Sequence, residues 1–277
     1  NGVEVVGCHG VLLSRCEQCR LFRLIICEQC SLCQWCLQHD SKSETMIRMT
    51  MSRRERLRAS TIDEIKHAAL AQIENDGAAA LSVRGVARDI GMSPAGLYRY
   101  YDGRDALLTE LITDAYTDLA VAVERAIASE DGSSADRFAA GVRAYRAWAL
   151  AEPNRFLLIF GTPIPGYAAP EGGPTVEANR RMGQAFFAVA GEALERGELD
   201  PHTAREATPG ELAFSEEIAS EGAIPPSVVG ALLGTWAHWH GIVALEVTHQ
   251  FDWIYANDAD AFFDAEIARM VDSLGLR

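Results

Sequence analysis

The sequence predicts an all-α fold, and three observations lead to this prediction. From residue 51 to the end, apolar residues recur at the three- and four-residue spacing of amphipathic helices. No segment shows the two-residue alternation that is typical of a half-buried β-strand. Serine or Ser-Pro precedes the periodic segments, and Gly or Pro follows them, as expected at helix starts and stops.

Helices in the first half are each bounded by a capping or a breaking residue. We expect Ser60, Ser82 and Ser93 to be N-caps, with Pro94 at a first helical position where its missing N–H does no harm. The expected helices cover 60–77, 82–89 and 93–101, and a long helix then ends near Asp131.

The second half continues the helical pattern around two loops. A helix from Ser134 to Pro153 is followed by a short apolar segment, 155–160, and by a Pro/Gly-rich loop, 161–174. Two more helical stretches flank a second loop, 200–226, which we expect to be mobile because it holds four prolines and several glutamates. The final helix is expected over 258–274.

Length and composition indicate a globular protein of about two domains. The chain has 277 residues, of which 48% are hydrophobic and 23% charged, and these values exclude a disordered or collagen-like chain. No apolar run approaches the ~18 residues of a membrane span, and polar and Cys residues interrupt any secretory signal at the start. We therefore expect a soluble, cytoplasmic protein with no membrane partner.

The charge is distributed unevenly along the chain. Residues 53–104 carry nine basic and seven acidic side chains, whereas residues 105–277 carry eleven basic and twenty-seven acidic ones. The net charge of −14 therefore resides in the C-terminal part. This asymmetry is typical of a DNA-facing module joined to a body that DNA repels.

The first ~50 residues differ in composition from the rest and hold all seven cysteines, between Cys8 and Cys36. Their CxxC spacings suit a zinc site. The run of four cysteines, 27–36, resembles ferredoxin loops, although those loops have three residues before the fourth Cys and this chain has two. The absence of Ala and the repeated Cys-Glu-Gln-Cys favour a third interpretation, upstream sequence translated in frame with no fold of its own. We prefer the third interpretation and expect no cofactor and no metal.

Residues 82–104, SVRGVARDIGMSPAGLYRYYDGR, have the pattern of a helix-turn-helix. Ala87 supplies the small residue where two helices cross, and Gly91 supplies the turn. The positions that should be buried are apolar: Val86, Ile90, Met92, Leu97 and Tyr100, with Tyr101 beside them. The second helix of such a motif can lie in the major groove of DNA.

Residues 60–111 resemble the DNA-binding domain of the tetracycline-repressor (TetR) family, on the Leu-Tyr-Arg-Tyr-Tyr…Ala-Leu-Leu signature. The resemblance implies that Arg84 reaches bases or backbone from the first helix of the motif. It places these residues at the groove: Ser93, Pro94, Ala95, Gly96, Tyr98 and Arg99. It places Tyr100 and Arg104 at phosphates. The family more often has His-Phe-Pro-Ser-Lys at the positions of residues 100–104, which here are Tyr-Tyr-Asp-Gly-Arg. Arg104 keeps the positive charge of that lysine, while Asp102 adds a negative charge that repels phosphate.

The segment from Thr235 to Glu246 is apolar on two helical faces, so we expect it to be buried on two sides. It resembles the Trp-His-Gly signature of one C-terminal subclass of the same family, loosely over 145–274. That resemblance implies dimerisation through the last two long helices and binding of a small inducer. His238 and His240 point about 200° apart on a helix and therefore cannot share a metal. The candidate pocket residues are Tyr145, Trp148, Phe156, Phe160, Phe186, Trp236, Trp239 and His240.

These observations predict a homodimeric transcription regulator, most simply a repressor that a small-molecule inducer releases from a palindromic operator in double-stranded DNA. The expected organisation is a Cys-rich extension (1–50), a helix-turn-helix domain (51–104) and a helical ligand-binding and dimerisation domain (105–277). No nucleophile–base arrangement or phosphate loop supports an enzyme. The alternatives are a metal- or redox-sensing regulator that uses the Cys segment, and an enzyme or carrier on an all-α scaffold.

Overall fold

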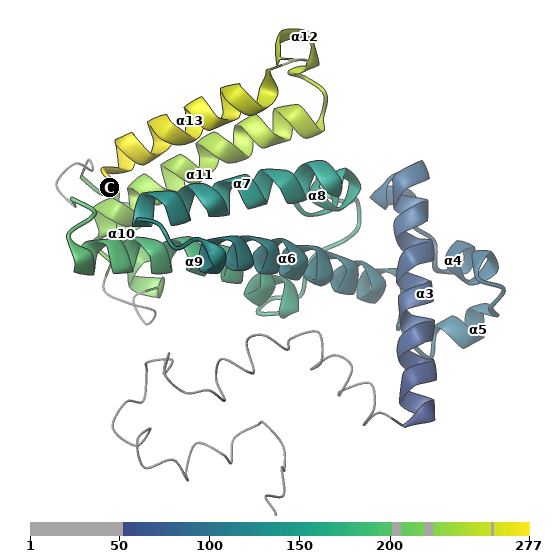
Figure 1. The fold of residues 1–277 in the computed structure, drawn as a ribbon. Helices are drawn as coiled ribbons and strands as arrows, with labels where there is room; N and C mark the ends of the chain where they lie inside the picture. The colour runs from purple at the N-terminus through teal and green to yellow at the C-terminus, as the bar shows by residue number, and fades with distance from the viewer. Residues whose placement is uncertain (1–51, 201–205, 219–223, 256–257) are drawn as a thin grey trace, which may run out of the picture. The chain divides into compact units, whose positions relative to one another are not determined.

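The computed structural model describes residues 52–200, 206–218, 224–255 and 258–277 (Figure 1). Within these ranges the regular elements are helices, and Leu199 and Leu276 form an isolated antiparallel bridge. The all-α prediction is confirmed. The cysteines of residues 1–50 lie outside the described residues.

The first described helix, α3 (Arg53–Asp76), begins seven residues before the expected N-cap Ser60, which lies inside it. The expectation was wrong because another pair caps the helix. The amide N–H of Ser52 donates to Glu55 Oε2 (2.7 Å), and that of Glu55 donates to Ser52 Oγ (3.2 Å). Such a reciprocal capping box satisfies N–H groups that the first turn leaves unpaired.

The helix-turn-helix forms as expected from its caps. Helix α4 (Val83–Asp89) begins where Ser82 Oγ accepts from the N–H of Gly85, and α5 (Pro94–Leu97) begins where Ser93 Oγ accepts from the N–H of Gly96. Gly91, between them, has φ +66°, a left-handed conformation that glycine adopts without a steric penalty. The short 3₁₀ helix η3 (Ala78–Ala80) connects α3 to α4.

A first hydrophobic core, called here the helix-turn-helix core, joins α3, α4, α5 and the start of α6 (Arg104–Ser129). Val86, Leu97 and Tyr101 are buried in it and Ile90 is half-buried, as the sequence pattern predicts. Leu158, from a distant part of the chain, is also buried in this core.

The remaining helices build a second core, on α7 (Ser134–Ala151), α9 (Pro174–Arg196), α11 (Pro226–Val247) and α13 (Ala259–Leu274). Helix α6 packs along α7 and α9, and α11 packs along α13 (Figure 1). Two shorter helices, α8 (Pro153–Phe160) and α12 (Asp252–Tyr255), lie in the connections.

The expected loop 200–226 contains a helix, α10 (Pro209–Ile218), which the expectation missed. Thr208 and Glu211 cap it reciprocally: the N–H of Thr208 donates to Glu211 Oε2 (2.7 Å), and that of Glu211 to Thr208 Oγ1 (3.4 Å). The Thr-x-x-Glu spacing is a helix-start signal that the sequence carries.

Helix α11 has the length and the mean hydropathy, 1.3, that a membrane span would need. However, 44% of its apolar window is buried within the protein, and its Trp239 and Val243 belong to the second core. One face of this helix therefore packs in the second core.

Candidate nucleic-acid interface and ligand pocket

The candidate DNA-reading surface consists of side chains that α4 and α5 leave exposed. Arg84 is exposed on α4, and Ser93, Pro94 and Ala95 are exposed at the start of α5. Tyr98, which is 48% exposed although it is aromatic, and Arg99 follow directly. The structure thus places six of the nine expected contact residues on the surface, around the start of the second helix of the motif.

Gly96, which the resemblance places at the groove, is buried instead. A Cβ atom at this position would lie 2.9 Å from Met92 Cγ and 3.2 Å from Ser93 Oγ. Gly96 therefore allows the turn to pack closely against α5, and it donates its N–H to the Ser93 cap. Tyr100 is half-buried and packs against the helix-turn-helix core.

Arg104, expected at phosphate, has its donors directed into the domain. Its Nε donates to the carbonyl of Leu81 (3.2 Å), and its Nη2 donates to the carbonyls of Ala78 (3.1 Å) and Ala79 (3.3 Å). Its Nη1 lies 3.6 Å from Asp105 Oδ1. The guanidinium thereby ties the start of α6 to the η3 turn that leads into α4.

Gln72 on α3 is a positioning residue that the sequence analysis missed. Its Nε2 donates to Asp89 Oδ2 (2.7 Å) at the end of α4, and its Oε1 accepts from the N–H of Ser82 (3.3 Å) at the start. A Cβ at Gly85 would lie 2.6 Å from Gln72 Nε2, so Gly85 makes room for this amide. No local spacing signals these contacts, because the partners are 10 and 17 residues away.

In the second core, Tyr145 and His240 form a hydrogen-bonded pair among aromatic rings. Tyr145 Oη lies 2.7 Å from His240 Nδ1, and the His240 ring lies against those of Phe156, Phe160 and Trp236, with centroid distances of 4.8–5.6 Å. Burial lowers the pKa of His240 and raises the pKa of Tyr145 well above its ordinary value. Both groups are therefore neutral near pH 7, and they share one hydrogen bond.

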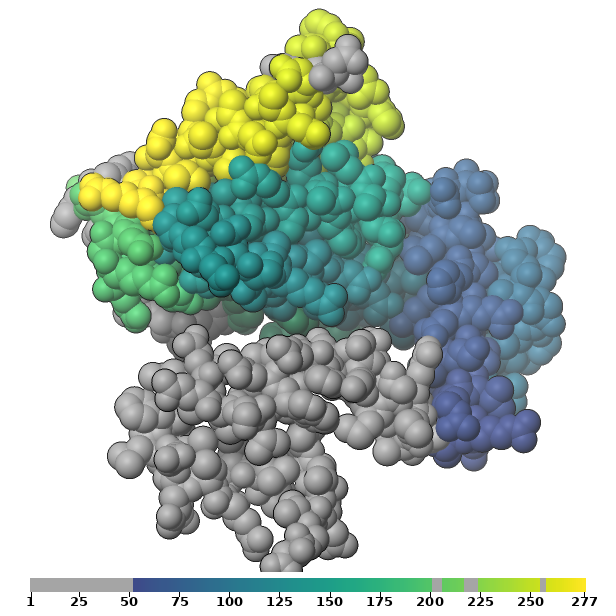
Figure 2. Space-filling model, viewed as in Figure 1, coloured from purple at the N-terminus to yellow at the C-terminus, as the bar shows by residue number. Residues whose placement is uncertain are grey.

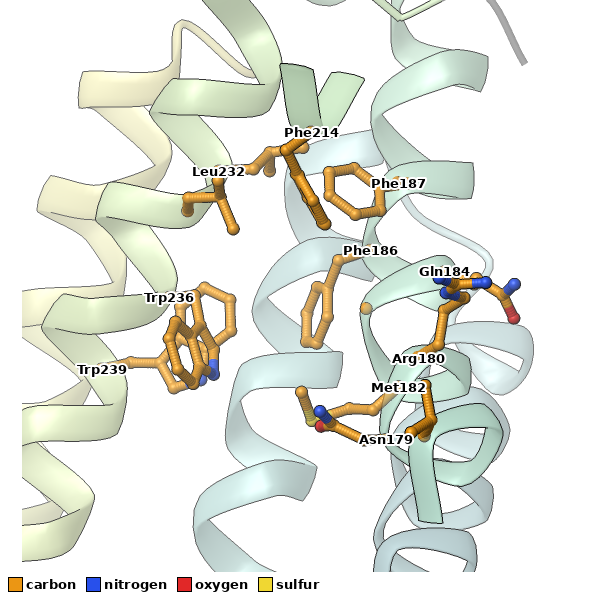
Figure 3. Close-up of a pocket in the computed structure, with 13 residues that line it drawn as sticks. Asn179, Arg180, Met182, Gln184, Phe186, Phe187, Phe214, Leu232, Trp236 and Trp239 are labelled. Atoms are coloured by element: carbon orange, nitrogen blue, oxygen red, sulfur yellow. The ribbon is translucent and has the colours of Figure 1, made fainter. Parts of the chain in front are cut away.

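A separate cavity of about 310 Å³, called here the aromatic pocket, is lined by α9, α10 and α11. This volume is in the range of small-molecule sites. Figure 3 shows Trp236 and Trp239 from α11 facing Phe186 from α9. The Phe187 and Phe214 rings, 6.5 Å apart between centroids, come from α9 and α10.

Three of the eight expected pocket residues, Phe186, Trp236 and Trp239, line the aromatic pocket. Tyr145, Phe156, Phe160 and His240 do not, because they pack on one another inside the core. Trp148 does not either; the guanidinium carbon of Arg155 lies 5.7 Å from its ring centroid. The sequence analysis missed the other lining residues, which are Val176, Asn179, Arg180, Met182, Gly183, Gln184, Phe187, Phe214, Leu232 and Leu233.

The side of α11 away from the core presents Gly234, Ala237, His238 and Leu245, which are exposed. The neighbouring helix α13, which is yellow in Figure 2, also has an exposed outer surface. Glu266 of α13 is buried, its Oε2 lies 3.3 Å from His238 Nε2, and Arg269 is its second partner. Among the described residues, no group of three His, Cys, Asp or Glu side chains could hold a metal ion.

Two family descriptions match this chain. Residues 65–111 match "Bacterial regulatory proteins, tetR family", and residues 138–270 match "Tetracyclin repressor-like, C-terminal domain". The HTH-type transcriptional regulator Rv1816 from Mycobacterium tuberculosis is 36% identical over 207 residues, which are 72% of this chain and 86% of that protein.

Two solved structures of regulatory proteins are also similar to this chain. Regulatory protein SCO4313 has a TM-score of 0.62 and 35% identity, over 80% of this chain and 100% of its own. A TetR family transcription regulator from Marinobacter aquaeolei VT8 has a TM-score of 0.57 over 80% of this chain and 100% of its own. At 14% identity, the second likeness shows the fold alone.

Proposed function

This chain belongs to the TetR family of bacterial transcriptional regulators, and we propose that it is a cytoplasmic repressor that a small-molecule inducer releases from a palindromic operator. The observation that carries the proposal is the exposed set on α4 and α5, held in place by two serine caps. Proteins of this family regulate transcription, and we propose no enzymatic role for this one.

We assign DNA contact to the exposed residues of the motif. Arg84 reads base edges, Arg99 and Tyr98 contact bases or phosphate, and residues 93–95 form the surface that approaches the groove closely. Gly96 and Arg104 position this surface. We propose that the DNA-binding domain comprises 51–104 and that its core is completed by the first two turns of α6, up to Ile112.

Dimerisation is assigned to the outer faces of α11 and α13. A helix-turn-helix protein reads two half-sites about 34–36 Å apart as a two-fold dimer. The exposed Leu245 and the small Gly234 and Ala237 allow a second copy to approach α11 closely.

The aromatic pocket is the proposed inducer site. Its cavity lies in the larger helical domain, and its lining is apolar apart from a few polar groups, which is typical of small-molecule sites. Inducer binding would change operator affinity by the coupling free energy between the two sites, usually ~1–3 kcal/mol.

The test is binding of the full chain to DNA flanking its own gene, measured across a salt series with and without a chelator. We expect tight binding to one palindrome, with an affinity that falls steeply with salt because phosphate contacts release counterions. Equal affinity for unrelated DNA would refute the specific regulator. Binding that the chelator abolishes would favour the metal-sensing alternative based on the Cys segment.

A further inference from the structure

A second cavity, called here the loop pocket, adjoins the aromatic pocket. It has a volume of about 460 Å³ and is lined by α6, by the end of α8 with the loop after it, and by the start of α9. Val176 and Asn179 of α9 line both cavities. The two cavities therefore lie on either side of one turn of α9.

Two of the residues that line the aromatic pocket carry hydrogen-bond donors without acceptors. The indole nitrogens of Trp236 and Trp239 are buried and have no hydrogen-bond partner among the described residues, and the Trp239 side chain is 1% exposed. A buried N–H without an acceptor costs free energy, and a ligand acceptor recovers it only where an indole turns toward the cavity. The aromatic side chains of the lining fit a flat apolar ring.

The loop pocket has a different chemistry. Its polar side chains are neutral: the hydroxyls of Tyr116, Thr162, Tyr167 and Thr175 and the amide of Asn179. No charged side chain of the described residues lines it. Burial of a carboxylate without a partner is costly, whereas an amide, ester or hydroxyl can hydrogen-bond with these groups.

The walls of the loop pocket also belong to the helix-turn-helix core. Leu158 is buried in that core, and Ile159, Ile164 and Tyr167 pack against it. Tyr167 Oη lies 3.0 Å from Thr109 Oγ1 on α6, and Tyr116 Oη donates to the carbonyl of Ile159 (3.1 Å). A group that enters the loop pocket therefore contacts residues that also pack on the helix-turn-helix core.

We propose that the two cavities form one site for an uncharged, elongated amphipathic molecule. Its flat apolar ring lies in the aromatic pocket, and its neutral polar tail reaches the loop pocket past Asn179. The tail, and not the ring, lowers operator affinity. This last step rests on the proposed function, whereas the binding step does not.

Three probes test the binding step by calorimetry on the full chain without DNA: naphthalene, 6-(2-naphthyl)hexanamide and the matched 6-(2-naphthyl)hexanoate. Each buried methylene contributes about fourfold to affinity, so we expect the amide to bind at least about thirtyfold more tightly than naphthalene. The carboxylate should bind at least about tenfold more weakly than the amide. Equal or tighter binding of the carboxylate, or no binding of any probe, would overturn the proposal.

Substitutions locate each part of the probe. Gly183→Leu fills the aromatic pocket, where a Cβ meets nothing closer than 3.8 Å, and should abolish binding of all three probes. Gly191→Leu is the matched control on α9. Beyond the local backbone of α9, no atom of the described residues lies within 4 Å of its added Cβ, and Gly191 lines neither cavity, so binding should stay unchanged. Ala169→Phe in the loop pocket should reduce amide affinity at least about tenfold and leave naphthalene affinity unchanged. Loss of naphthalene binding in that variant would mean that the ring lies in the loop pocket, which contradicts the proposal.

The regulatory step is measured separately, as fluorescence anisotropy of labelled upstream DNA. The amide should release DNA from the wild-type chain, and saturating naphthalene should not. Release by naphthalene would refute the role of the tail. If the chain binds no DNA at all, the proposed function fails, and the calorimetry still decides the ligand class.

Discussion

Replacement of Arg104 by alanine separates a structural role from a DNA-contacting one. In the structure its guanidinium makes three hydrogen bonds, 3.1–3.3 Å long, to the carbonyls of Ala78, Ala79 and Leu81. A hydrogen bond that involves a charged group contributes about 1.5–3 kcal/mol when it is well buried. The Arg104 side chain is 25% exposed, and water can reach the exposed Ala79 in the variant.

We therefore expect Arg104→Ala to lower the free energy of unfolding by about 2–3 kcal/mol, less than the sum of three buried bonds. For a chain of this size, this decrease corresponds to a fall in Tm of about 5–10 °C. Thermal unfolding of the full chain, followed by circular dichroism, measures it. We expect the slope of log affinity against log salt to stay that of the wild type, because the guanidinium donors are directed to carbonyls of the protein.

Arg99→Ala is the matched control, since Arg99 is exposed and is proposed to contact DNA. Its Tm should stay within about 2 °C of the wild type, while its salt slope should become shallower by about 0.9 for each phosphate that Arg99 neutralises in the wild type. An Arg104→Ala variant with an unchanged Tm and a shallower salt slope would refute the structural role and restore the phosphate contact.

Three further predictions concern the larger domain. Burial lowers the pKa of His240, so the unfolded chain binds more protons than the folded chain as the pH falls below about 6.5. When the pH is lowered from 7 to 5, the free energy of unfolding in urea should therefore fall more for the wild type than for His240→Gln. An equal fall in both proteins would contradict this prediction. Gly141→Ala should lower the free energy of unfolding by about 1–3 kcal/mol, because the added Cβ would lie 2.9 Å from atoms of Ile127 and Phe186. Gly191→Ala has open space around the added Cβ and should raise the free energy of unfolding by up to about 1 kcal/mol. Denaturant titrations of the two variants measure both changes. Leu245→Glu should convert the proposed dimer to monomer in sedimentation velocity with little change in Tm, and a persistent dimer would move the interface elsewhere.

Short-range patterns in the sequence predicted where both helices of the helix-turn-helix begin, but α5 ends at Leu97, four residues before the expected end at 101. The Ser82 and Ser93 caps, Pro94 at the first helical position and the left-handed Gly91 all depend on residues within four positions of one another. Such interactions form between neighbours in the chain, so their spacing is visible without a structure. Two capping boxes of the same kind, at Ser52 and at Thr208, were equally visible and were overlooked.

The pocket was predicted less well, because aromatic residues with the same periodicity can have different surroundings. Tyr145 and Trp239 both lie on apolar helix faces, yet Tyr145 packs inside the core and Trp239 lines a cavity. Whether a ring faces a void depends on how α9, α10 and α11 pack together. Phe214 lines the cavity from a helix that the sequence analysis interpreted as a loop.

The sequence by itself determined the fold class, the DNA-binding motif and its caps, since these follow from helical periodicity and from hydrogen bonds between near neighbours. Only the tertiary structure decided which arginine supports the motif and which is exposed. Arg99 and Arg104 are only five residues apart, but Arg104 reaches carbonyls 23–26 residues earlier in the chain, whereas Arg99 is exposed. The packing of α3, η3 and α6 brings those carbonyls to its guanidinium, and contacts at such separation leave no periodic signal in the sequence.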